Sequence, residues 1–86
     1  MVHLIIAKGT PAQIQGVENQ IKNFSIGWHN LAPGMWLVAS NYTATPLRDH
    51  LRDHCAQAAV LRIQKEWGSW AYKSLADWLL SAENVF

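Results

Sequence analysis

Residues 28–55 read WHNLAPGMWLVASNYTATPLRDHLRDHC, and this stretch decides the fold. Its first residues continue a pattern in which Phe24, Ile26 and Trp28 alternate with small or polar residues. Because successive side chains of a strand point to opposite faces, this alternation predicts a strand with one buried face.

A Pro-Gly turn and a second strand follow in the same stretch. Pro33 presets φ for a turn and Gly34 can adopt positive φ, so residues 31–35 are predicted to form a hairpin connection. Residues 35–39 are apolar at every position, which is typical of a strand in the middle of a sheet.

The end of the stretch predicts a helix. Thr43 or Thr45 can cap it, and if Thr45 is the cap, Pro46 takes the first helical position, where a missing N–H costs nothing. Apolar residues then recur at steps of four and three, which predicts one buried stripe made of Leu47, Leu51, Cys55 and Ala58.

The residues before this stretch predict a strand and a helix. Residues 2–8 are mostly β-branched or apolar and are bounded by Gly9-Thr10-Pro11, as expected for a short buried strand. Thr10 and Pro11 again suit a cap and a first helical residue, so a helix is predicted over residues 11–23. Its buried side has the spacing of Ile14, Val17 and Ile21.

The residues after it predict a fourth strand over residues 59–64 and, beyond Trp67-Gly68, a C-terminal helix over residues 69–80. One side of that helix carries Ala71, Leu75, Trp78 and Leu79. The order strand, helix, strand, strand, helix, strand is that of a ferredoxin-like α+β fold, βαββαβ. We therefore expect a four-stranded antiparallel sheet with two helices on one face, and an extra helix lying on a free sheet face of its own chain or of a partner.

Composition indicates one small domain that associates with itself. The chain has 86 residues, half of them hydrophobic and only 15% charged, which is a low charged share for a small soluble monomer. We expect some apolar surface to be buried in a homodimer. The five tryptophans are the expected core or dimer anchors: Trp28, Trp36, Trp67, Trp70 and Trp78.

Charge and cysteine usage set further expectations. A net charge of +1 gives no strong pull on nucleic acid or on an anionic membrane. A single Cys forms no internal disulfide, and the start MVHLIIAKG lacks the pattern of a signal peptide. No stretch approaches a transmembrane span, so we expect no membrane partner and a cytoplasmic location.

The repeat RDHLRDHC is the sharpest local motif. On a helix His50 and His54 sit four residues apart and can chelate one metal, with Asp53 or Cys55 nearby. The metalloprotease motif needs a Glu after the first His, where this chain has Leu51. We therefore favour a solvated helix face or a dimer contact, with no metal and no cofactor.

Basic residues are the candidates for binding phosphates. The expected nucleic-acid-binding residues are Lys8, Arg48, Arg52, Arg62 and Lys65, with acidic neighbours cancelling part of their charge. Tryptophans can also stack on bases, although their usual place is a core or an interface.

No catalytic residue is predicted from the residue pattern. His3, Lys8 and His29 lie on or beside the first two strands, yet no Ser, Cys or carboxylate is placed to complete an acid/base site. Cys55 falls on the apolar stripe and is predicted to be a buried small hydrophobe.

The block WHNLAPGMWLVASNYTATPLRDHL, the strand VLRIQ and the tail WAYKSLADWL resemble the small SinR-like proteins. These are grouped with the nuclease-like second subunit of the CRISPR spacer-acquisition complex. The segments Trp36-Leu37-Val38 and Thr45-Pro46-Leu47-Arg48 carry most of the resemblance. The opening LIIAKGT falls where that family has its first strand, so the resemblance covers nearly the whole chain.

The resemblance implies a ferredoxin-like protomer in a homodimer, in a group of metal-dependent nucleases and duplex-DNA-binding scaffolds of defence or mobile elements. In those members an Asp ends the first strand of each subunit and the pair holds a divalent ion. The matching place here is Lys8-Gly9, where an ammonium would repel the ion. We therefore expect a non-catalytic homodimer that binds a nucleic acid or a protein.

Two alternatives stay open at this point. One is a metal-dependent nuclease of the same superfamily, in which His29, His50 and His54 would be the suspects. The other is a protein-interaction subunit of a larger complex.

Overall fold

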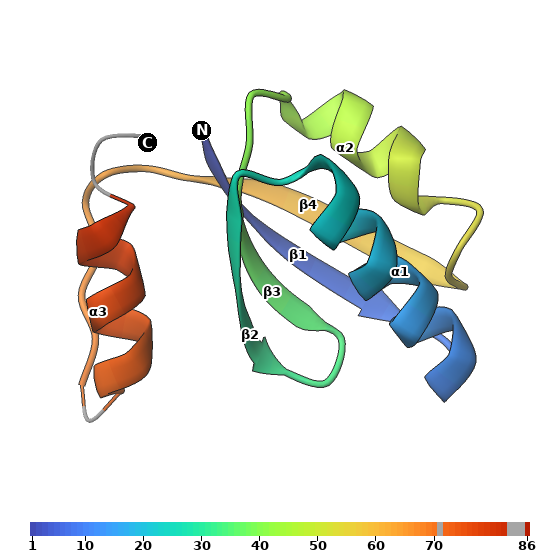
Figure 1. Ribbon diagram of the computed structural model, residues 1–86, viewed down its shortest axis with the longest axis horizontal. Coiled ribbons are helices and arrows are strands. Elements are labelled where there is room, and N and C mark those ends of the chain that lie inside the picture. The colour runs from blue at the N-terminus through green and yellow to red at the C-terminus, as the bar shows by residue number, and fades with distance from the viewer. Residues whose placement is uncertain (71, 83–85) are drawn as a thin grey trace.

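The computed structural model describes residues 1–70, 72–82 and 86. These residues form four strands and three helices (Figure 1). Their order and bounds are β1 (Val2–Lys8), α1 (Pro11–Phe24), β2 (Gly27–Ala32), β3 (Met35–Ala39), α2 (Ala44–Leu51), β4 (Gln57–Ile63) and α3 (Lys73–Ser81).

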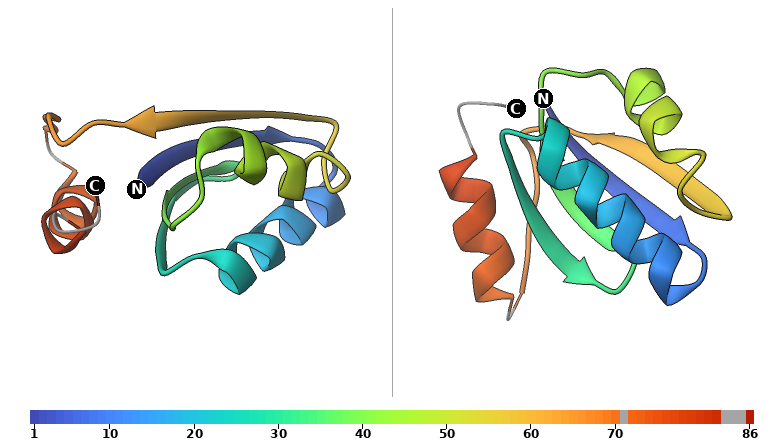
Figure 2. Two further views of the ribbon diagram at one scale, coloured as in Figure 1. Left: turned by 90° about the horizontal axis from the view of Figure 1, so that it is seen from above. Right: turned by 45° about the vertical axis from the view of Figure 1, so that its right-hand side comes forward.

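The described strands form one four-stranded antiparallel sheet in the order β2-β3-β1-β4. The all-apolar β3 is a central strand, as predicted, and β4 lies at one edge. α1 and α2 both cover the same face of the sheet (Figure 2). The α+β class is therefore confirmed, and the arrangement is consistent with a ferredoxin-like fold.

The main core fills the space between the sheet and these two helices. Ile5 of β1 and Trp36 and Val38 of β3 pack against Val17 and Ile21 of α1. α1 begins as the sequence predicts, because Thr10 and Gln13 form a reciprocal capping box and Pro11 follows the cap. These contacts fix the end of β1 and the start of α1 relative to the β2–β3 hairpin.

The opposite face of the sheet is covered only in part. α3 lies beside β2 (Figure 1), and its Leu79 packs with Leu37 and Ala39 of β3 and with Val2. Tyr72 donates a hydrogen bond to the Leu31 carbonyl at 2.9 Å. The C-terminal helix thus lies against its own sheet.

Further along that face the apolar side chains are half-buried or exposed. By strand alternation and register, five residues share this region, which we call the open sheet patch: Leu4, Ile6, Met35, Ala59 and Leu61. Leu61 is 49% exposed.

The first part of the hairpin differs from the prediction. The alternation of Phe24, Ile26 and Trp28 suggests a strand, but α1 runs on through Phe24 and β2 starts only at Gly27. Ile26 is 62% exposed instead of buried. The helical hydrogen bonds that end with the Ser25 N–H on the Ile21 carbonyl overrule the short alternating pattern.

The second half of the deciding stretch also differs in its details. α2 begins after Thr43, whose side chain makes no capping hydrogen bond, and it ends at Leu51. Cys55 and Ala58 therefore do not continue its buried stripe. The hairpin turn is shorter than predicted and contains only Pro33 and Gly34.

Two later elements are shifted relative to the sequence. β4 starts at Gln57, and its Val60 faces the main core while Leu61 faces the open side. α3 starts at Lys73 and not at residue 69. Ala71, which was assigned to its apolar side, lies outside the described residues.

Candidate functional site

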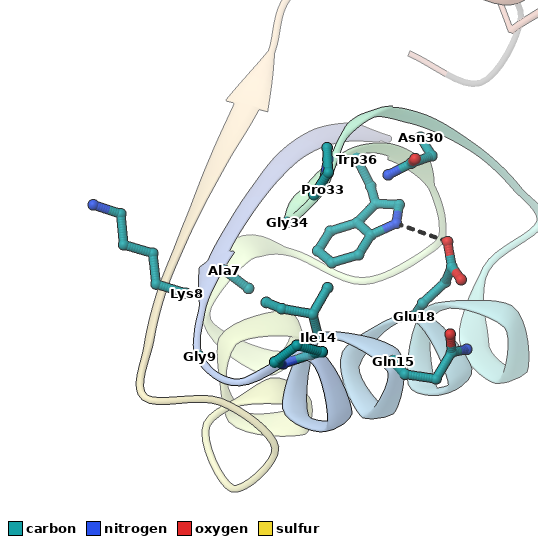
Figure 3. A pocket seen from close by; sticks show the side chains of 11 residues that line it. Ala7, Lys8, Gly9, Ile14, Gln15, Glu18, Asn30, Pro33, Gly34 and Trp36 are labelled. Atoms are coloured by element: carbon teal, nitrogen blue, oxygen red, sulfur yellow. Dashed lines mark hydrogen bonds between the residues drawn. The ribbon is translucent and has the colours of Figure 1, made fainter.

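A cavity of about 540 Å³ opens where β1 ends, α1 begins and the β2–β3 hairpin turns back (Figure 3). We call it the β1-end cavity. Its apolar wall is made by Ala7, Ile14, Pro33 and Trp36. The turn closes tightly here, because Gly34 has a φ of 82° and its carbonyl accepts the Ala7 N–H at 2.8 Å.

The polar groups of this cavity are organised by two side chains. The Trp36 indole N–H donates to Oε1 of Glu18 at 3.2 Å, which ties β3 to α1. The Asn30 amide donates to the carbonyls of Ala32 and Met35 at 2.9 and 3.0 Å, and so closes the hairpin. Gln15 also lines the cavity, and its amide donates to Asn19.

Lys8 and Gly9 border the cavity at the end of β1, but the Lys8 side chain points away from Trp36 and Glu18 (Figure 3). Lys8 is exposed and pairs in register with Gln57 of β4. The chain therefore presents an ammonium, and no carboxylate, at the end of its first strand.

The five predicted phosphate-binding residues all lie on or beside β4. Arg48 of α2 and Arg52, the residue directly after this helix, line a groove of about 410 Å³ together with Ala56 and Ala58. Arg48 also lines a second groove of about 340 Å³, which runs along residues 58–60. We call the strip formed by Lys8, Arg48, Arg52, Arg62 and Lys65 the basic edge.

Several of these cations already have partners. Arg48 forms an ion pair with Asp49 at 2.9 Å, and Arg62 donates to the Phe86 carbonyl at 3.1 Å. Lys65 is engaged as well. The Arg52 side chain makes no hydrogen bond or ion pair with the described residues, so its guanidinium is available to an incoming anion.

The two histidines of the RDHLRDHC motif are separated by the end of α2. His50 stacks near Phe24 and Tyr42, with ring centroids 5.4 and 5.3 Å away. His54 lies in the turn after the helix, where its backbone N–H donates to the Leu51 carbonyl. Among residues 1–70, 72–82 and 86, no group of three or more His, Cys, Asp or Glu side chains is placed to hold a metal.

The remaining candidates for chemistry lie in three different places. His3 is 1% exposed, and burial, followed by the nearby charges of Arg62 and the N-terminal ammonium, lowers its pKa. His29 packs against Trp78 of α3 at 6.3 Å. Burial raises the pKa of the Cys55 thiol, which disfavours the nucleophilic thiolate.

The tryptophans also occupy different environments. Trp36 is buried in the main core, and Trp28 packs at its border with Lys22 over its ring at 5.5 Å. Trp67 and Trp78 pack against the cluster on the other face. Trp70 is 92% exposed, so within one chain it anchors no core.

Glu18 and Asn30 are site residues that no sequence pattern predicts. Glu18 lies outside the predicted buried spacing of Ile14, Val17 and Ile21, and only the crossing of α1 over β3 shows that it meets Trp36. The single signal available in the sequence was the tryptophan itself, because a buried indole N–H usually finds an acceptor.

No helix in the described part of the chain is both long and apolar enough to cross a bilayer. Comparison with known proteins gave no matching family model, no matching curated protein and no matching solved structure.

Proposed function

We propose that the protein is a non-catalytic homodimer of ferredoxin-like βαββαβ protomers that binds nucleic acid by its phosphates along the basic edge. The observation that supports this is the placement of Lys8, Arg48, Arg52, Arg62 and Lys65 on or beside β4. These are five of the seven lysines and arginines of the chain. Their gathering at one sheet edge gives a nearly neutral protein a local positive strip.

Arg48 and Arg52 are the central residues of this binding mode. They lie four residues apart, Arg48 in α2 and Arg52 just after its end, and both line one groove beside β4. Guanidinium groups match phosphate oxygens in a bidentate geometry. A phosphate at Arg48 competes with Asp49, which limits the affinity, whereas Arg52 has no such competitor among the described residues.

The homodimer is proposed to form through the open sheet patch. α3 covers only part of this sheet face, and the side chains of Leu4, Ile6, Met35, Ala59 and Leu61 remain partly or fully exposed. A second copy that packs its own patch against them would remove this apolar surface from water.

The proposal excludes the metal-dependent cleavage of the resembling family. Members of that family have a carboxylate at the end of the first strand, where this chain has Lys8. An ammonium at that position opposes a divalent cation. Metal-dependent cleavage of RNA or DNA by the pure protein would overturn the non-catalytic part.

Binding is tested by fluorescence anisotropy with labelled single-stranded RNA and duplex DNA over a range of salt concentrations. We expect affinity to fall steeply with salt. In the Arg48→Gln/Arg52→Gln variant, the slope of log K against log salt should lose about 0.7 per abolished contact for single strands and about 0.9 for duplex.

The matched control is Lys22→Gln/Lys73→Gln. It removes the same charge from α1 and α3, away from the basic edge, and should keep nearly the whole salt slope of the unmodified protein. Absent or salt-insensitive binding, or an equal loss in both double variants, would refute the phosphate site and direct the search to a protein partner.

A further inference from the structure

We propose that the β1-end cavity binds a small organic cation, with an ammonium, amidinium or guanidinium group attached to an apolar ring or short chain. This site is separate from the basic edge and does not depend on nucleic-acid binding. The inference rests on which hydrogen-bonding atoms around the cavity are already used and which are left.

The donors of the cavity's polar side chains are already engaged. The Trp36 indole N–H is taken by Glu18, and the Asn30 amide nitrogen makes two bonds inside the hairpin. The Gln15 amide nitrogen donates to Asn19. A ligand that needs donors from these side chains would have to break these bonds, including the Trp36–Glu18 bond that ties β3 to α1.

The atoms left over are acceptors. In the described part of the chain, Oδ1 of Asn30 and Oε1 of Gln15 accept no hydrogen bond, and Glu18 keeps one carboxylate oxygen beside its bond to Trp36. A ligand that carries several N–H groups therefore meets acceptor oxygens that receive no hydrogen bond from the described protein groups. Such donors are supplied by ammonium, amidinium and guanidinium groups.

The charge at the cavity is negative, opposite to that of the proposed ligand. Of the side chains that line the cavity, two are charged, and the ammonium of Lys8 points away while Glu18 faces Trp36 (Figure 3). Lys22 is the nearest cation to Glu18, with its Nζ 3.9 Å from Oε2, and about half of its side chain is exposed. An incoming cation can replace this loose surface pair at little cost.

The apolar part of the ligand has a wall to contact. Ile14, Pro33 and Trp36 line the same space, and Figure 3 shows the indole ring between the Asn30 and Ile14 side chains. A volume of about 540 Å³ lies within the range of small-molecule sites. The combination of an apolar wall with a few convergent acceptors selects an amphipathic cation.

The probe pair for the test is benzamidine and benzamide, which share a ring but differ in charge. Binding is followed by the Trp36 indole N–H signal in ¹H–¹⁵N NMR spectra of the full chain. We expect benzamidine to shift this signal in a saturable way, and benzamide to bind about tenfold or more weakly, since hydrogen bonds to charged groups are the stronger ones.

Glu18→Gln is the variant that tests the carboxylate. It retains a side-chain oxygen for the Trp36 N–H, so the fold is kept, and it should weaken benzamidine about tenfold without changing nucleic-acid affinity. Asp53→Asn removes the same charge from an exposed turn and should leave benzamidine binding unchanged. Equal binding of the two probes, indifference to Glu18→Gln, or no saturable shift would each overturn the proposal.

Discussion

One imidazole of this protein, that of His3, is buried where a proton on it is disfavoured. The His3 side chain is 1% exposed and its Nδ1 has no hydrogen-bond partner in the described part of the chain. Burial, Arg62 and the N-terminal ammonium all disfavour a proton on it, so its pKa is lowered in the folded state. The unfolded chain therefore binds this proton more readily than the folded one.

We predict that the free energy of unfolding falls as the pH is lowered through the ordinary histidine value of about 6.5. Urea unfolding at a series of pH values between about 7.5 and 5.5, above the range where carboxylates titrate, measures this loss. His3→Leu should flatten the dependence, whereas His50→Leu, which changes an exposed residue, should keep it. An unchanged slope in His3→Leu would contradict the assignment.

For individual residues, the sequence predicts buried positions better than polar contacts. Val17 and Ile21 are buried as their spacing indicates, since helical periodicity alone decides which side they face. The Glu18 contact with Trp36 depends on how α1 crosses β3. That crossing is a tertiary property, and no local pattern around residue 18 contains it.

The β2–β3 hairpin is the element whose geometry the sequence signals most directly. Pro33 and Gly34 form its turn, and Gly34 has positive φ, as its chemistry allows. A side chain at residue 34 would also collide with the Ala7 carbonyl. Both the backbone conformation and the space therefore demand glycine here.

We predict that Gly34→Ala lowers the free energy of unfolding by about 1–3 kcal/mol. Gly27→Ala is the matched control, because a Cβ at residue 27 meets no atom within 4 Å, and its effect should stay within about 1 kcal/mol. Thermal and urea unfolding of the two variants decide the point. Similar stabilities would mean that the turn relaxes without strain.

Element types are predicted well in this chain and element ends less well. Thr10 caps α1 with a complete capping box, so that helix starts where the sequence places it. Phe24, however, belongs to the helix and not to a strand, because a three-residue alternation is too short to separate the two periods. The end of α2 at Leu51 is not predicted, because no local end signal such as glycine marks it in the sequence.

At the scale of the whole molecule, the two faces of the sheet differ. One is covered by α1 and α2, and the other is shared between α3 and the open sheet patch. The sequence predicts the surplus of apolar surface from composition. The sequence does not show whether α3 packs on the sheet of its own chain or on that of a partner, because both arrangements bury the same residues.

We predict that the unmodified protein is a dimer in solution and that Leu61→Glu shifts it to monomer, since a charge would be buried at the centre of the proposed contact. Light scattering coupled to size-exclusion chromatography measures the mass. Ile26→Glu alters a residue that is also exposed but lies outside the patch, and it should remain dimeric. A monomeric unmodified protein would rule this interface out.

The position of β4 has one more consequence, for solubility. It runs for seven residues, QAAVLRI, without proline or glycine, and in the described chain it pairs on one side only, with β1. An unpaired edge strand of this kind can pair with the edge strand of another chain, and repeated pairing of this kind leads to fibrils. Two copies that align along this strand would bring their positive charges together, so we expect the residues that are proposed to hold phosphate to oppose such growth as well.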